Sequence, residues 1–189
     1  YNQFSGNRDI LLIGGDVQQV DDISSYEFSD KVLELAQKLS CKEVITLGGV
    51  GLAEIPKKPK VYCTGNSKKI IESYKNELVS NSLYGVVGPI VGVSGLLVGL
   101  ASRKDMEAIS FLAETYGHPM YLGIKGAKEI LKVLNKKLSL SLDISKLDRE
   151  IKDIESEVLK KTEQLADVTK SMALKKLQKK FGKDVDYIG

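Results

Sequence analysis

The chain contains no tryptophan, one histidine and two cysteines among its 189 residues. So few cysteines and histidines cannot supply the ligands of an ordinary zinc site, and no Cys-x-x-Cys pair occurs. Aromatic residues make up only 6% of the chain, which disfavours a stacking platform for nucleic-acid bases. We therefore expect no metal site, and the composition disfavours nucleic acid as a partner.

Long apolar runs, a large charge excess and a cysteine framework are also absent. The longest apolar stretches, such as residues 96–101, are far shorter than the roughly 20 residues of a membrane-spanning helix. The net charge of +3 is too small to indicate nucleic-acid binding by itself. Cys41 and Cys63 are expected to be reduced thiols in a chain of this length. The sequence thus predicts a cytoplasmic protein without a membrane partner.

The sequence does contain enough apolar residues, 42% of the chain, for one main folded domain. Residues 1–144 alternate short β-branched runs with helical patterns, which predicts an α/β domain with a mostly parallel sheet. The expected strands are 10–13, 43–47, 60–63 and 108–113, with a further strand end at 85–89. The expected helices are 25–39, 67–79, 94–102 and 124–137.

The C-terminal part has a different pattern. Ser145 and Asp148 fit a capping box, and no proline or glycine follows before Gly182, so residues 145–182 are predicted to form an arm with a helix of some 36 residues, about 54 Å long. Its apolar positions follow a heptad repeat and are expected to pack against another helix or subunit: Leu147, Ile151, Ile154, Val158, Leu165, Val168 and Met172. The lysines between 170 and 183 indicate a solvated coiled-coil end, and residues 183–189 a flexible peptide.

Three short motifs could carry chemistry, and each has a structural alternative. Residues 48–51 are glycine-rich and could approach a phosphate or form a tight turn. Residues 92–95 resemble the start of a nucleophile elbow around Ser94, but the last glycine is replaced by Leu96. His118 could act as a base or could be a loop histidine. Nothing in the sequence brings these residues together, so no catalytic residue and no cofactor is assigned.

Three ordered segments carry a family resemblance: Gly88 to Gly99, Ala108 to Gly117 and the helix from Gly126 to Leu134. Over residues 9–145 the chain resembles the archaeal proteasome assembly chaperone family, which has a proteasome-assembly-chaperone-2-like domain. The resemblance implies a three-layer α/β/α sandwich similar to purine nucleoside phosphorylases, without an established catalytic activity. It also implies oligomers that bind proteasome α subunits.

The same resemblance directs attention to both ends of the chain. Members of that family can dock through a C-terminal hydrophobic-Tyr-any triplet, which nominates Tyr187, Ile188 and Gly189 as partner-binding residues. Here the tyrosine is third from the end, and Asp186 stands where the hydrophobic residue would be. Members also usually begin with an additional strand, a glycine-containing loop and a helix that would precede Tyr1, which implies that an N-terminal segment is missing from this sequence.

Two hypotheses for function follow. The first is a non-enzymatic, ATP-independent assembly chaperone that forms homo-oligomers and binds proteasome α subunits or the 20S α ring. The second is a small-molecule enzyme of phosphorylase or hydrolase type that uses the loops at 48–51, 88–95 and 114–118. A nucleic-acid-binding role for the lysine-rich end is a third possibility, and it requires a steep loss of binding with added salt.

Overall fold

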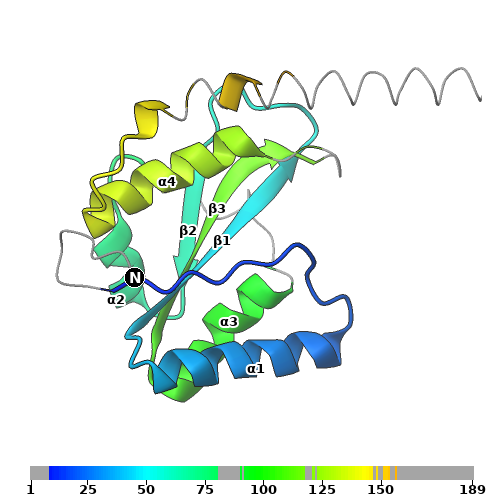
Figure 1. The fold of residues 1–189 in the computed structure, drawn as a ribbon, viewed down its shortest axis with the longest axis vertical. Coiled ribbons are helices and arrows are strands. Elements are labelled where there is room, and N and C mark those ends of the chain that lie inside the picture. Colours follow the sequence, from blue (N-terminus) through cyan, green and yellow to red (C-terminus); the bar gives the residue numbers. More distant parts are fainter. Residues whose placement is uncertain are drawn as a thin grey trace, which may run out of the picture.

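The computed structural model describes residues 9–80, 90, 92–117, 121, 123–146, 148, 151–153 and 156. Its helices and strands, in chain order, are α1 (Asp22–Lys38), β1 (Glu43–Leu52), β2 (Val61–Gly65), α2 (Lys68–Tyr74), α3 (Val93–Ala101), β3 (Glu107–Tyr116) and α4 (Ile124–Leu138). Figure 1 shows the sheet between α4 on one side and α1 with α3 on the other. The predicted α/β class with helices on both faces of a sheet is confirmed in this part of the chain.

The described sheet is mixed, which corrects the prediction of a mostly parallel one. The strand order is β1-β3-β2, and β3 runs parallel to β1 but antiparallel to β2. The chain between β1 and β2 spans only residues 53–60, and a parallel crossover needs about a dozen residues or more. A short connection containing Pro56 and Pro59 therefore returns β2 in the opposite direction.

Helix α1 lies against α3 and closes one face of the sheet. It begins after Asp21, whose side chain accepts a hydrogen bond of 2.9 Å from the backbone N–H of Ser24. The buried side of α1 carries Leu33 and Ala36, which pack with α3, with the residue before β3 and with the start of β3, namely Val98, Ala101, Met106 and Ala108. The predicted helix over 25–39 is thus present and begins three residues earlier.

The other face of the sheet holds the larger aromatic core. Phe111 of β3 and Tyr74 of α2 are almost completely buried, and their rings meet edge to face with centroids 5.3 Å apart. Helix α4 covers this core with Ile130 and Val133. It can approach closely because Gly126 faces β3: a Cβ there would lie 2.9 Å from the carbonyl oxygen of Glu114.

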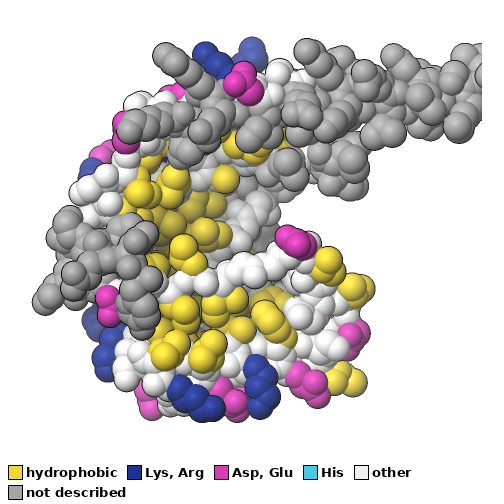
Figure 2. Space-filling view, viewed as in Figure 1, with side chains coloured by type: hydrophobic (Ala, Val, Ile, Leu, Met, Phe, Trp, Pro, Cys, Tyr) yellow, Lys and Arg dark blue, Asp and Glu magenta, His cyan; other side chains and the backbone are white. Residues whose placement is uncertain are grey.

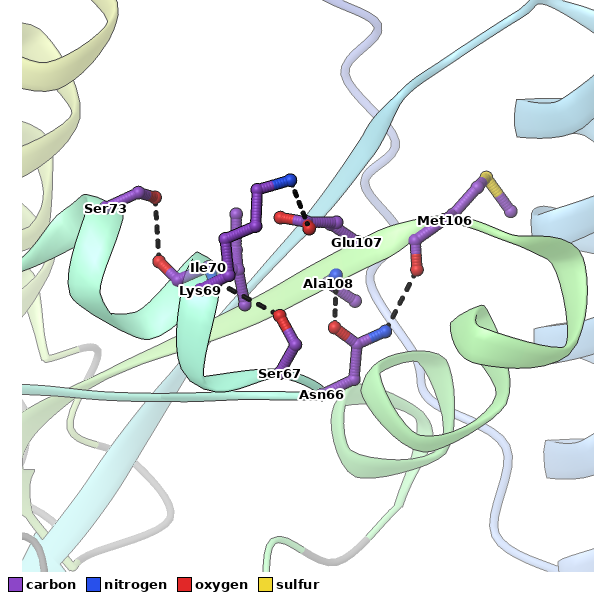
Figure 3. A network of polar contacts seen from close by, with 8 residues as sticks. All are labelled: Asn66, Ser67, Lys69, Ile70, Ser73, Met106, Glu107 and Ala108. Carbon is purple, nitrogen blue, oxygen red and sulfur yellow. Dashed lines mark hydrogen bonds and ion pairs between the residues drawn. The ribbon is translucent and has the colours of Figure 1, made fainter.

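Asn66 joins the end of β2 to the start of β3 (Figure 3). Its amide nitrogen donates to the carbonyl of Met106 at 2.9 Å, and its amide oxygen accepts from the N–H of Ala108 at 3.0 Å. The next residue, Ser67, accepts from the N–H of Ile70 at 3.2 Å and so begins α2, as predicted. Two connections that are distant in sequence are therefore fixed to each other by side-chain hydrogen bonds.

Three predicted features differ from the structure. Residues 10–13 form no strand and are exposed. The helix predicted to reach residue 79 ends at Tyr74, because Asn76 accepts from the N–H of Leu78 and forms a turn. The glycine-rich residues 48–51, expected as a loop, continue β1 and pair with β3.

Most of the predicted C-terminal arm lies outside the described residues. Residues 151–153 are helical, and Ile151 is buried with 8% of its surface exposed. The other heptad residues, the peptide 183–189 and the predicted strand end at 85–89 lie outside the described part of the chain. The length of the arm and the packing of its repeat therefore stay predictions.

Candidate interaction surface

Strand β1 presents an uncovered edge within the described part of the chain. It is ten residues long, carries no charge after Glu43, and pairs there only with β3. Thr46 is its single buried residue, and Leu47 is 52% exposed. An apolar edge strand of this kind offers unpaired backbone groups to another chain.

The N-terminal segment adds a second group of exposed apolar residues. Residues 10–13 were predicted as a buried strand, yet Leu12 is 86% exposed and Ile13 52%. Further along, Val17 and Val20 are exposed by 83% and 96%. Figure 2 shows hydrophobic side chains gathered on the face over which this segment and α1 pass. Contiguous apolar surface of this kind marks interaction sites.

The first turns of α1 combine exposed apolar and acidic side chains. Ile23 and Tyr26 are exposed by 73% and 51%. We define the acidic apolar face by two groups of exposed residues: the apolar Val17, Val20, Ile23 and Tyr26, and the acidic Asp16, Asp22, Glu27 and Asp30. Figure 2 shows the two kinds of side chain alternating along the lower right edge, where the N-terminal segment turns into α1.

Charge on this face is strongly one-sided. From residue 9 to residue 30 the sequence contains no lysine or arginine. Asp21 lies immediately before α1. Hydrogen bonds from the backbone and side chain of Ser24 lower its pKa, so it stays ionised at neutral pH. Asp30 has a cation nearby, because Lys104 lies 3.3 Å from its carboxylate. The surface therefore favours a partner that is both apolar and basic.

The residues considered for catalysis are not assembled into a site in the described part of the chain. Ser94 lies in the first turn of α3, and its carbonyl oxygen faces the hydroxyl of Thr46 at 3.5 Å. His118 lies outside the described residues. No group of three or more potential metal ligands occurs among the described side chains.

A polar cluster at the end of β3 was only partly visible in the sequence. The Tyr62 hydroxyl donates to the Glu114 carboxylate at 2.7 Å, and the N–H of Lys60 donates to its other oxygen at 2.9 Å. Burial, and to a lesser extent this carboxylate, raise the pKa of Tyr62 to about 12. Glu114 thereby links β3 to β2 and to the residue that precedes it. The pairing was not predictable, because it depends on the antiparallel register.

None of the described helices is long and apolar enough to pass through a lipid bilayer.

Comparison with solved structures finds this fold in two proteins of Pyrococcus furiosus. The chain is 33% identical to Pyrococcus furiosus PbaB, an archaeal proteasome activator, with a TM-score of 0.66 over 79% of this chain and 63% of that one. It is 25% identical to Pyrococcus furiosus PbaA, an archaeal homolog of proteasome-assembly chaperone, with a TM-score of 0.62 over 80% and 66% of the two chains.

Residues 1–162 match the model of the PAC2 family, and the chain belongs to this family. Among curated relatives, the uncharacterized protein MJ1210 of Methanocaldococcus jannaschii is 24% identical over 159 residues, which is 83% of this chain and 60% of that protein. The chain thus spans well under two thirds of that relative's length. The family resemblance read from the sequence is confirmed.

Proposed function

We propose that the protein is a non-enzymatic, ATP-independent assembly chaperone that binds the proteasome. The observation that carries the proposal is family membership together with the 33% identity to a proteasome activator. The surface is consistent with it, because exposed apolar residues cover the N-terminal segment, α1 and the edge of β1. A cytoplasmic location fits this role.

The partner in this proposal is the proteasome α subunit or the assembled 20S α ring. Tyr187, Ile188 and Gly189 form the docking peptide, in which the tyrosine ring supplies apolar surface and a hydroxyl. Self-association through the heptad positions of the arm presents several such peptides at once, which raises the apparent affinity for a symmetric ring.

Binding of the full chain to purified 20S proteasome tests this proposal by calorimetry. Deleting residues 187–189 is expected to weaken binding roughly thirtyfold, since loss of an anchoring tyrosine costs about 2 kcal/mol. Asp186→Asn is the matched control and keeps residues 187–189. Unchanged binding by the deletion variant would move the contact to the α/β body.

The enzymatic alternative is tested separately with nucleosides plus phosphate and with simple esters. We expect no turnover by the wild-type chain, and Ser94→Ala is expected to retain the fold. A turnover that Ser94→Ala or His118→Ala abolishes in a folded protein would replace the chaperone proposal with a catalytic one.

A further inference from the structure

The side chains of the acidic apolar face are exposed in the described part of the chain. Val20 is 96% exposed and Val17 83%, so they add little to the stability of the described domain. Asp16 and Asp22 are close to them in sequence, Glu27 is exposed on the first turns of α1, and no basic residue occurs between residues 9 and 30. The occupant of such a surface has to bring both apolar side chains and positive charge.

The C-terminal part of the chain has this complementary chemistry. Residues 168–181 contain no acidic residue, and their lysines are Lys170, Lys175, Lys176, Lys179 and Lys180. On a helical period, Leu174, Leu177 and Phe181 share one side, and Lys175, Lys176 and Lys179 share another. Long lysine side chains can lie along an apolar surface while their ammonium groups reach carboxylates at its rim.

We propose that residues 168–181 of one copy dock on the acidic apolar face of a second copy of this chain. The charges are complementary, and the apolar side chains of the segment meet Val17, Val20 and Ile23. The inference rests on the self-association in the proposed function but not on proteasome binding.

A second copy is favoured over the chain's own tail by the arrangement of the fold. The helical residues 151–153 lie near the start of α4, where Lys128 pairs with Asp148, on the opposite side of the sheet from α1 (Figure 1). The tail of the same chain would have to pass around the sheet to reach α1. Two copies can instead exchange tails symmetrically, so that each contact is made twice in one dimer.

Sedimentation velocity over a range of protein concentrations tests the contact with paired charge reversals. The tail variant carries Lys175→Glu, Lys176→Glu, Lys179→Glu and Lys180→Glu, and the face variant carries Asp16→Lys and Glu27→Lys. Each is expected to weaken self-association at least tenfold at low salt, because attraction becomes repulsion. Combining the two sets is expected to restore association to within about threefold of wild type.

Matched controls separate the contact from general charge effects. Lys57→Glu with Lys58→Glu changes two exposed lysines in the connection between β1 and β2 and is expected to leave association unchanged. Val20→Asp is expected to weaken association at least tenfold while the melting temperature stays the same, because the side chain is 96% exposed. Deleting residues 187–189 is expected to leave self-association intact even where proteasome binding is lost.

Several outcomes would overturn the proposal. One is wild-type association by both charge-reversed variants, and another is failure of the combined variant to recover. A chain that is monomeric at every concentration excludes the second copy. Charge-dependent compaction of such a monomer would assign the face to the chain's own tail. Proteasome binding is measured in a separate experiment. Loss of self-association therefore does not affect the test of residues 187–189 as the proteasome-binding peptide.

Discussion

Strands β1 and β3 are paired along ten positions, yet their side chains have opposite surroundings. In β3, residues Ala108 to Ala113 are all buried, because the strand has neighbours on both edges and helices on both faces. In β1, Thr46 alone is buried. The two strands are similar in apolar composition but differ in role. Strand β3 forms part of the core, and β1 leaves apolar surface available for a partner.

The same contrast extends to the two sides of the molecule. Around α2, α4 and β3, apolar side chains are enclosed, with Phe111, Ile109 and Val133 fully buried. On the N-terminal segment and the start of α1, apolar side chains such as Leu12 and Val20 are almost fully exposed. Stability is therefore expected to depend on the first region, and association on the second.

The largest expected difference between the regions comes from one truncation in each. Phe111→Ala is expected to lower the free energy of unfolding by about 3–5 kcal/mol, because it leaves a cavity beside Tyr74. Val20→Ala, at a side chain that is 96% exposed, is expected to change it by less than about 0.5 kcal/mol.

Urea unfolding at equilibrium measures both changes. If the two variants lose similar stability, the N-terminal segment is part of the core in solution and the contrast drawn above fails. A large loss of unfolding free energy in Phe111→Ala, with an unchanged dependence on urea concentration, supports the contrast. The slope of that dependence reports the surface exposed on unfolding.

A smaller effect is expected where polar side chains join the enclosed region. Asn66→Ala removes the partner of the Ala108 N–H and the Met106 carbonyl and is expected to cost about 1–3 kcal/mol. Asn76→Ala is the control, because within the described part of the chain the Asn76 side chain bonds to residues 74 and 78 alone, so its loss affects one local turn. If both variants lose the same stability in thermal unfolding, the hydrogen bonds of Asn66 to the start of β3 contribute no more than a local turn does.

Much of the fold was predictable from the sequence, because hydrophobic period reports local structure directly. The strand over 108–113 and the helix over 124–137 appear as β3 and α4 with small changes at their ends. The helix predicted from Ser67 to residue 79 is too long. Leu78 and Val79 continue its apolar spacing, but Asn76 turns the chain. The spacing of apolar residues does not show whether an asparagine side chain will bond to the backbone and form a turn or whether the helix will continue.

Strand partners and exposure were less predictable, because both depend on distant residues. Residues 10–13 have the composition of a buried strand, but a strand also needs a neighbour, and they have none among the described residues. The alternation of Asp16, Val17, Val20 and Asp22 could have suggested an exposed binding surface from the sequence. The link between Tyr62 and Glu114 could not, since it follows from the register of β2 against β3.

The smallest expected effect concerns that link and is visible through its pH dependence. Tyr62→Phe removes the hydrogen bond to Glu114 and is expected to cost about 1 kcal/mol at neutral pH, because the Lys60 N–H still satisfies the carboxylate. Burial raises the pKa of Tyr62 from 10.0 to about 12, so the folded state keeps the phenol protonated longer than the unfolded state does. Its contribution is complete below pH 10 and falls as the pH rises towards 12. The stability gap between wild type and Tyr62→Phe, measured by urea unfolding from pH 8 to 12, is therefore expected to shrink above pH 10. A gap that stays constant over this range would show that the hydroxyl titrates alike in both states and does not bridge β2 and β3.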